Sequence, residues 1–274
     1  MPISERRKKW LKERSKPVSL RGYAFLYPTT TQRKLLKSVT EILDGMLFKT
    51  RESIIDKFKI LGENEKATAL GLEINRLRDQ YKPSFDSVAE LATRGLSQDS
   101  EMSFAKALSK IQGGGNISTG LLTGRYRDVF QANAKENVGL FKTIASVHFD
   151  RVETAVMDSI TTGNGLQDLV PFFESHNPGI KNYAKHRALD QTRKAFTSMN
   201  LARMKDAGID KFEWQHSHGS ADPRKLHQEL DGKVFDIDNP PYIGDMYGER
   251  IHGFPGQLPN CRCTMKPVFE FKES

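Results

Sequence analysis

Residues 208–235 read GIDKFEWQHSHGSADPRKLHQELDGKVF, and within them the sequence pattern of the chain changes from helical to mixed. The alternation of apolar and polar side chains over Lys211 to His216 predicts a strand. Asp222-Pro223 predicts the start of a short helix, with the aspartate as N-cap and the proline at the first helical position. Asp231-Gly232 predicts a tight turn, and a second short strand is expected at Lys233 to Phe235. The stretch therefore predicts a small module that combines α and β structure.

The sequence that follows is first a loop and then a strand. Eight prolines and glycines crowd into the segment from Pro240 to Pro259, which predicts a loop that only tertiary contacts can order. The alternation then resumes, and Arg262 to Phe271 is expected to be the last strand. We therefore assign residues 209–274 to one α+β module.

Upstream of Gly208 the spacing of apolar residues is helical. Apolar side chains recur at intervals of three and four from Leu35 to Leu61, which predicts a helix that begins near Thr31 and ends at Gly62. The same spacing, interrupted by glycine and proline, predicts further helices. Their expected ranges are 70–81 with a stop at Pro83, 88–96, 102–111, 125–162, 166–173 and 180–207. The fold class is thus mainly α, with a helical N-terminal body and a short β-sheet near the C-terminus.

Three glycines at 113–115 mark the strongest internal boundary. Together with the change of pattern at Gly208, they predict four parts: a basic arm at 1–30, a helical domain at 31–115, a second helical region at 116–208 and the α+β module at 209–274. No glycine-rich phosphate-binding loop follows a strand, so the sequence gives no support for nucleotide binding.

The positive charge of the chain is concentrated at its N-terminus. Residues 1–60 hold 15 Lys and Arg against 6 Asp and Glu, a net charge of +9, whereas the remainder holds 27 against 28, a net charge of −1. A basic block of this kind binds nucleic acid or an acidic protein surface, or it stays a solvated terminus. The basic residues proposed for such contacts are Arg6, Arg7, Lys8, Lys9, Lys12, Arg14, Lys16 and Arg21.

The sequence also indicates the compartment. No run of about 18 apolar residues is present, so no transmembrane helix is expected, and the N-terminus lacks the apolar core of a signal peptide. These features predict a protein that stays in the cytoplasm until it is carried elsewhere. The only two cysteines, Cys261 and Cys263, cannot cross-link a secreted scaffold of 274 residues, and a disulfide between residues two apart would be strained. The pair is either reduced and inert or part of a metal site.

Four of the seven histidines fall in the last quarter of the chain, near both cysteines. One hypothesis is a zinc site made by Cys261, Cys263 and two histidines, with His218 and His227 as candidates, because zinc takes four nitrogen or sulfur ligands in a tetrahedron. In a flat strand the two sulfurs would lie about 6–7 Å apart, so this hypothesis requires the chain to turn at the cysteines. The alternative is a set of buried, satisfied histidines and two small apolar cysteines, with no cofactor.

A second hypothesis is catalysis by the same residues. His227 would work with Asp222 or Asp231 in a metal-dependent hydrolase or nuclease, or a histidine would activate a cysteine nucleophile. Neither arrangement carries a specific motif. Asp222 is already explained as a helix cap and Asp231 as a turn residue. We therefore expect that the protein is not an enzyme.

Taken together, the motifs of the C-terminal half resemble the phage Mu F-like head morphogenesis family, the minor head proteins of tailed bacteriophages. The resemblance covers about residues 137–268, and the order of its motifs is more specific than any one of them. The motif residues are Arg187, Asn200, Trp214, Asp222, Arg224, His227, Asp231, Gly232, Asn260, Cys261, Arg262 and Cys263. The chain departs from the family pattern at Asp190-Gln191, where an alanine-rich stretch is common, and it has Pro223 where many members carry a variable residue.

The resemblance implies a structural component of the virion that is present in the head and made in the host cytoplasm. Such proteins associate with the portal protein, with other head proteins and with the head interior, and they act in head morphogenesis, DNA packaging or DNA delivery. The basic arm is then expected to face packaged DNA, and no membrane contact is implied. Asn260 and Arg262 are expected to fix the long loop through side-chain hydrogen bonds. The alternative function is a cytoplasmic module that binds DNA or a partner protein.

Overall fold

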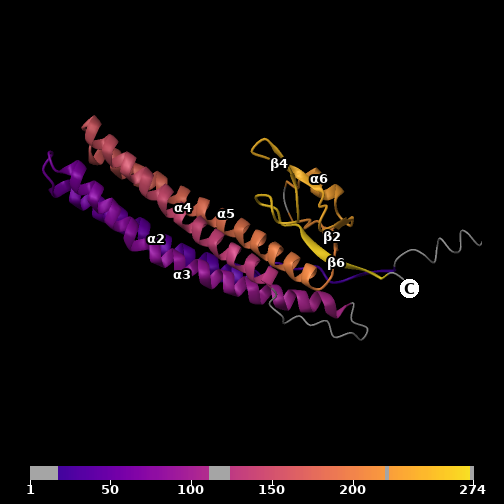
Figure 1. The fold of residues 1–274 in the computed structure, drawn as a ribbon. Helices are drawn as coiled ribbons and strands as arrows, with labels where there is room; N and C mark the ends of the chain where they lie inside the picture. Colours follow the sequence, from indigo (N-terminus) through magenta and orange to yellow (C-terminus); the bar gives the residue numbers. More distant parts are fainter. Residues whose placement is uncertain (1–17, 111–123, 220–221, 272–274) are drawn as a thin grey trace, which may run out of the picture. The chain divides into compact units, whose positions relative to one another are not determined.

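The computed structural model describes residues 18–110, 124–219 and 222–271. Four long helices make up most of it (Figure 1): α2 Thr29–Ile60, α3 Lys66–Ser109, α4 Gly124–Thr162 and α5 Leu166–Asp206. The short elements are β1 Val18–Arg21, β2 Lys211–Gln215, α6 Lys225–Glu229, β3 Val234–Asp236, β4 Tyr242–Met246, β5 Glu249–His252 and β6 Thr264–Phe271. The predicted fold class, mainly α with a small C-terminal α+β module, is confirmed.

The chain folds into two compact units. The helical unit consists of Pro28–Ser97 and Phe130–Ala195, and the mixed unit consists of Met1–Tyr27, Gln98–Val129 and Phe196–Ser274. Each unit has a hydrophobic core of its own. The mixed unit therefore draws on three segments that are far apart in the sequence.

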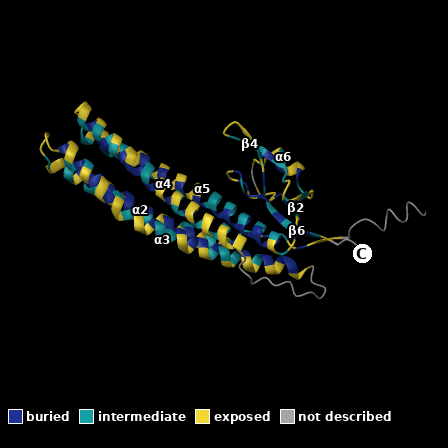
Figure 2. Cartoon of the chain, in the orientation of Figure 1, coloured by how far each residue is buried: buried dark blue, intermediate teal, exposed yellow. Residues whose placement is uncertain are grey.

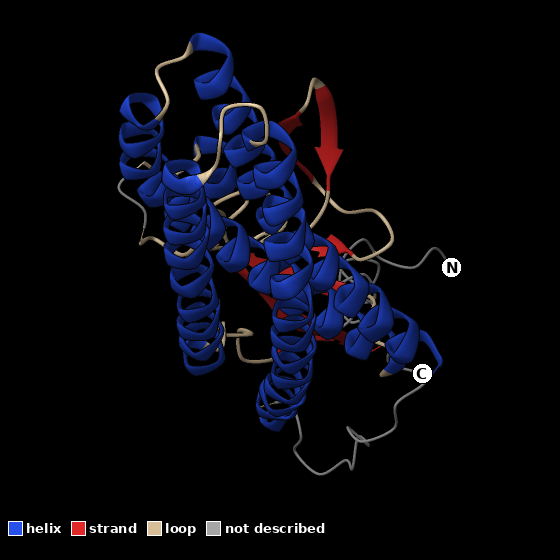
Figure 3. Cartoon of the chain, turned by 90° about the vertical axis from the view of Figure 1, so that its left-hand side faces the viewer, coloured by secondary structure: helices blue, strands red, loops and turns tan. Residues whose placement is uncertain are grey.

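In the helical unit, α2 and parts of α3, α4 and α5 run side by side (Figures 1 and 3). Each helix is buried on one side and exposed on the other (Figure 2). On α2 the buried residues Val39, Leu43, Met46 and Leu47 recur at spacings of four, three and one, as expected of an apolar helix face. Burial of each such side chain contributes roughly 1.5–3 kcal/mol. Within the described ranges, no helix is both long enough and apolar enough to span a lipid bilayer.

The helix ends predicted from prolines are wrong. α3 continues through Pro83 and α5 through Pro178, so the helices predicted on either side of each are continuous. α5 also contains Pro171, which lies inside the helix predicted at 166–173. An interior proline costs roughly 3 kcal/mol, because it removes a backbone donor and clashes with the preceding turn. Burial offsets this cost, since Leu77 and Phe85 on the two sides of Pro83 enter the same core. All three prolines are exposed, so their rings leave that core undisturbed.

A four-stranded antiparallel sheet organises the mixed unit, with the strand order β1-β6-β2-β3. β2 and β3 confirm the two strands predicted at 211–216 and 233–235 to within a residue or so. β1 lies inside the predicted arm and pairs with β6, from Val18 opposite Phe271 to Arg21 opposite Val268. The core against the sheet includes Phe25, Phe104, Phe196, Phe212, Trp214 and Met265.

Three local expectations in the α+β module are wrong. The segment 240–259, predicted as a loop, contains the antiparallel hairpin β4–β5. α6 begins at Lys225 with Arg224 in the N-cap position, so Asp222 lies too far from the helix to cap it. β6 begins at Thr264, two residues later than predicted, because the chain turns at Pro259-Asn260 and residues 261–263 are still irregular.

Candidate functional site

His227 lies on α6 within the core of the mixed unit, where the residue is 3% exposed. Its ring packs edge-on against Trp214, with 5.2 Å between the ring centroids. Nε2 lies 3.0 Å from the carbonyl oxygen of Ile243 on β4. Because a carbonyl only accepts hydrogen bonds, Nε2 of the neutral imidazole carries the proton and Nδ1 presents a lone pair.

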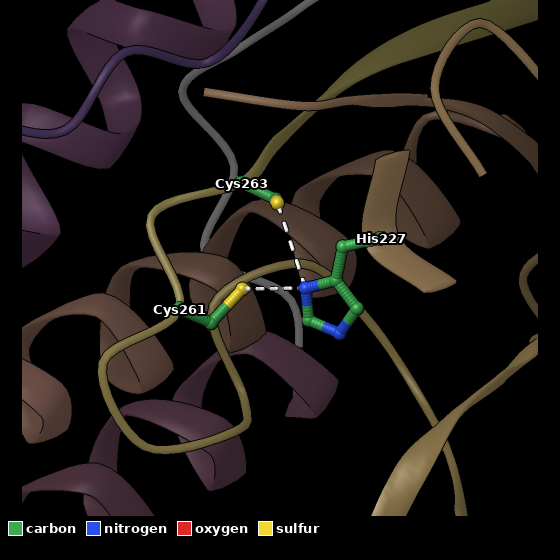
Figure 4. A group of neighbouring side chains, drawn as sticks. All are labelled: His227, Cys261 and Cys263. Atoms are coloured by element: carbon green, nitrogen blue, oxygen red, sulfur yellow. Dashed lines mark hydrogen bonds between the residues drawn. The ribbon is translucent and has the colours of Figure 1, made fainter. Parts of the chain in front are cut away.

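Cys261 and Cys263 reach the same point from the segment that precedes β6. The Cys261 amide donates to the Leu258 carbonyl over 3.0 Å, and Asn260 has a φ of +59°, so the chain turns sharply before the cysteines. Nδ1 of His227 lies 3.5 Å from Sγ of Cys261 and 3.7 Å from Sγ of Cys263 (Figure 4). All three ligand atoms lie within 4.8 Å of one another, and all three residues are buried. The turn that the zinc hypothesis required is therefore present.

Neighbouring backbone and side-chain groups hold the two cysteines in place. The Gly256 amide donates to Sγ of Cys261 over 3.4 Å, and the Tyr27 hydroxyl donates to the Cys263 carbonyl over 2.8 Å. Gly256 has a φ of +84°, and a Cβ at this position would lie 2.2 Å from the Tyr27 hydroxyl oxygen. Only glycine therefore allows the Tyr27 ring and the Cys261 sulfur to approach this backbone together.

The environment separates the acidities of the two thiols. The pKa of Cys261 is lowered, chiefly by the hydrogen bond from Cys263 and further by His227 and the Gly256 amide. The pKa of Cys263 is raised, because its proton bonds to Cys261 and because burial disfavours its thiolate. The buried indole N–H of Trp214 has no partner at normal hydrogen-bond distance among the described residues, yet it is close enough to Cys263 to favour the thiolate. Cys261 is therefore the more acidic thiol of the pair.

A pocket of about 260 Å³ opens beside this cluster, and His227, Cys261 and Cys263 all form part of its wall. Two arginines of the wall are bound to carbonyl oxygens. Arg224 donates to the Pro259 carbonyl over 2.9 Å, and Arg262 donates to the Gly219 carbonyl over 3.2 Å. The Arg262 bond joins the segment before β6 to the loop after β2. Asn260 contributes its positive-φ turn to the same wall.

His218 lies apart from the cluster. Its Nδ1 is 3.3 Å from Nδ1 of His216, its Nε2 is 3.3 Å from Oδ2 of Asp231, and its side chain is 74% exposed. Asp231 also accepts the His216 amide over 2.8 Å through Oδ1, and Gly232 completes the predicted turn with a φ of +71°. Asp231 thus fixes the loop after β2, and the cluster consists of one histidine and two cysteines.

Residues 150–266 match the family model described as Phage Mu protein F like protein. This segment is a Mu F-like region. It includes α5, the part of the mixed unit that runs from α5 to the start of β6, and the whole His227–Cys261–Cys263 cluster. An uncharacterized protein of Haemophilus influenzae is 32% identical over 137 residues, which are 50% of this chain and 29% of that protein. No solved structure matches the chain significantly.

The upstream motif residues of the Mu F-like region have different environments. Asn200 is buried, and its Oδ1 accepts the Ser100 hydroxyl over 3.2 Å. Arg203, one turn further along α5, donates from Nε to the same hydroxyl oxygen over 3.3 Å and lies over the Tyr126 ring. Asn200 therefore joins α5 to α3 within the mixed unit. Arg187 is exposed on the part of α5 that belongs to the helical unit.

The structure describes one of the eight proposed arm residues. Arg21 lies in β1 and forms an ion pair with Glu213 of β2, with 2.5 Å between Nε and Oε2. Arg21 is thus engaged within the sheet. The other seven, Arg6, Arg7, Lys8, Lys9, Lys12, Arg14 and Lys16, lie outside the described residues.

The arrangement proposed for acid–base catalysis is not assembled. Both ring nitrogens of His227 face groups other than carboxylates, namely the Ile243 carbonyl and the two sulfurs. Asp222 is exposed on the pocket wall, and Asp231 is bonded to the loop after β2.

Sequence reasoning missed three residues that shape the site. Ile243 supplies only its carbonyl, Gly256 supplies its amide and the absence of a side chain, and Tyr27 lies more than 230 positions from Cys263. Backbone contributions leave no signature in the residue types. Of the three residues, only Gly256 could have been found from the sequence, because it is a glycine shortly before the cysteines.

Proposed function

We propose that this protein is a minor head protein of a tailed bacteriophage that acts in head morphogenesis and contacts the portal protein and the head interior. One observation carries the proposal: the Mu F-like match extends from the end of α4 to β6 and contains the complete buried cluster with its pocket. Within this segment the buried residues maintain the fold, and His218 and Asp231 hold the loop after β2. These are the properties of a structural component.

The charge distribution supports a place next to DNA. The excess of basic residues falls within the first 60 positions, whereas the Mu F-like region begins at residue 150. A protein of this design contacts head proteins through its folded region and phosphate groups through its terminus. Portal contact and DNA contact are thus assigned to different parts of the chain.

Mass spectrometry of purified particles tests this proposal. The phage that encodes the chain is grown, full heads, empty heads and free tails are separated on density gradients, and peptides of the protein are quantified relative to the portal protein. The proposal predicts a constant ratio to the portal protein in both head fractions and depletion in free tails. A protein that stays in the lysate supernatant, or that co-sediments with tails alone, is not a head component.

A further inference from the structure

His227, Cys261 and Cys263 are buried and bring one nitrogen and two sulfur atoms within 4.8 Å of one another. The single lone pair on Nδ1 of His227 faces two sulfurs, at 3.5 and 3.7 Å, and can accept a hydrogen from only one of them. The Gly256 amide donates to Sγ of Cys261 over 3.4 Å, a contact that suits a thiolate. Two thiolates and an imidazole nitrogen form a donor set that binds zinc. Two buried thiolates require a cation between them.

The distances match those of a zinc ion bound by these three residues. Zinc lies about 2.3 Å from a cysteine sulfur and about 2.0–2.1 Å from a histidine nitrogen, so a tetrahedral angle places the two ligand atoms about 3.6 Å apart. The two observed nitrogen–sulfur distances bracket this value. One Zn²⁺ with two thiolates and a neutral imidazole has no net charge, which suits a site whose ligands are all buried.

The hydrogen bond on the other ring nitrogen of His227 is also typical of a metal site. A histidine ligand commonly donates its other ring N–H to a backbone carbonyl, which fixes the tautomer and aims the lone pair at the metal. Nε2 of His227 has this partner in Ile243. His227, Cys261 and Cys263 all line the pocket, so the pocket can supply a water molecule as a fourth ligand.

We propose that Nδ1 of His227, Sγ of Cys261 and Sγ of Cys263 bind a zinc ion, with a water molecule from the adjoining pocket as the fourth ligand. Binding deprotonates both thiols and releases their protons to solvent. The sulfur and nitrogen donors select zinc over magnesium or calcium, which prefer oxygen ligands. The ion joins α6 to the segment before β6. The proposal is independent of the location of the protein in a particle.

Metal analysis of the full-length protein is the primary test. The chain is purified under reducing conditions without chelators or a histidine tag, dialysed against Zn²⁺ and then against buffer, and analysed by inductively coupled plasma mass spectrometry. We expect about one zinc per chain. Zinc K-edge absorption spectroscopy should then show two sulfur and two lighter neighbours. A zinc content near zero, or a spectrum with oxygen and nitrogen neighbours only, overturns the proposal.

Variants assign the ligands. Cys261→Ser, Cys263→Ser and His227→Gln are each expected to lower zinc affinity at least tenfold, whereas the matched control His218→Asn, at an exposed position with positive φ, retains the wild-type stoichiometry. Retention of wild-type affinity by all three ligand variants, or loss in the control alone, overturns the assignment. If a variant does not fold, its zinc affinity cannot be compared with that of the wild type. Reduced, metal-free wild-type protein is then titrated with Co²⁺ instead. Thiolate-to-cobalt charge-transfer absorption supports the site, and its absence opposes it.

Discussion

His148 and His176 form a buried pair in the helical unit, with 3.0 Å between Nδ1 of His148 and Nε2 of His176. Burial, together with the neighbouring His176, lowers the pKa of His148 to about 3. The pKa of His176 is also lowered, first by burial and then by Arg151. One proton bridges the two rings, so both histidines are neutral at pH 7 and acidification works against the folded form.

Acidification should therefore destabilise the helical unit below about pH 6.5. The unfolded chain takes up a proton on each histidine near that pH, whereas the folded chain resists protonation of His148 until about pH 3. The stability contributed by the neutral pair is complete above the unfolded pKa and is lost as pH falls, by up to about 1.4 kcal/mol per pH unit and group. Urea unfolding followed by circular dichroism between pH 7.5 and 4.5 measures the slope.

Carboxylates titrate in the same range, so the slope must be compared between variants. His148→Leu removes the least exposed titrating ring and should flatten the pH dependence. His186→Gln, at an exposed position of α5, should leave it unchanged. Equal slopes for His148→Leu and the wild type would contradict the assignment.

Asn200 is the other residue whose role is local and measurable. Its Oδ1 accepts the Ser100 hydroxyl, and Arg203 donates to that same hydroxyl oxygen. Asn200→Ala leaves buried polar groups without a partner and should lower the free energy of unfolding by about 1–3 kcal/mol. A double-mutant cycle with Ser100→Ala should give a coupling energy of about 0.5–1.5 kcal/mol. A coupling energy of zero would mean that the two side chains act independently.

At the scale of elements, the sequence predicted helix faces and failed at helix ends. Three- and four-residue spacing identified the buried residues of α2, because periodicity reports which side faces a core. The stop at Pro83 was wrong, because a local signal does not include the burial that accumulates on both sides of it. The hairpin β4–β5 was missed for the same reason: its residues are ordered by contacts with distant segments, such as the Ile243 bond to His227.

Replacement of Pro83 therefore tests the balance between the cost of an interior proline and the burial of residues on both sides of it. Pro83→Ala restores a backbone donor inside α3 at an exposed position, so it should raise the free energy of unfolding by about 1–3 kcal/mol. Greater freedom of the unfolded chain reduces the gain. Thermal and urea unfolding measure it, and Pro28→Ala, just before α2, is a control with little expected effect. A destabilised Pro83→Ala protein would show that the helix depends on the proline.

The N-terminal arm should bind DNA through its charge, while β1 holds the adjoining residues in the sheet. Removal of residues 1–16 deletes seven of the eight proposed basic residues and leaves Val18–Arg21 paired with β6. We expect weaker binding to duplex DNA and a shallower dependence of the logarithm of the binding constant on the logarithm of salt concentration, by several units. Fluorescence anisotropy at several salt concentrations measures both. Unchanged binding by the truncated protein would exclude the arm from DNA contact.

At the scale of the whole molecule, the candidate site is shaped by segments that lie outside its sequence motif, such as the one that contains Tyr27. The motif alone does not predict these contacts. The ordered motifs were sufficient to identify the Mu F-like region and to place His227 near both cysteines as one hypothesis. His218 was the wrong companion, because β2 ends at Gln215 and the following turn directs His218 to Asp231. Contacts between residues that are distant in the sequence depend on how the core packs. The pattern of a single sequence does not predict that packing.

Residues 209–274 should therefore not fold alone. β1 occupies the edge of β6, and Phe25, Phe104 and Phe196 fill the core against Trp214 from outside that range. The isolated fragment would expose this core and leave β6 with an unpaired edge. Its single tryptophan, Trp214, is fully buried in the full chain and should have red-shifted emission in the fragment, with strong binding of a hydrophobic dye and no cooperative unfolding. Trp10→Phe in the full chain isolates the Trp214 signal for comparison, and a fragment with the same emission and a cooperative transition would show that the module is autonomous.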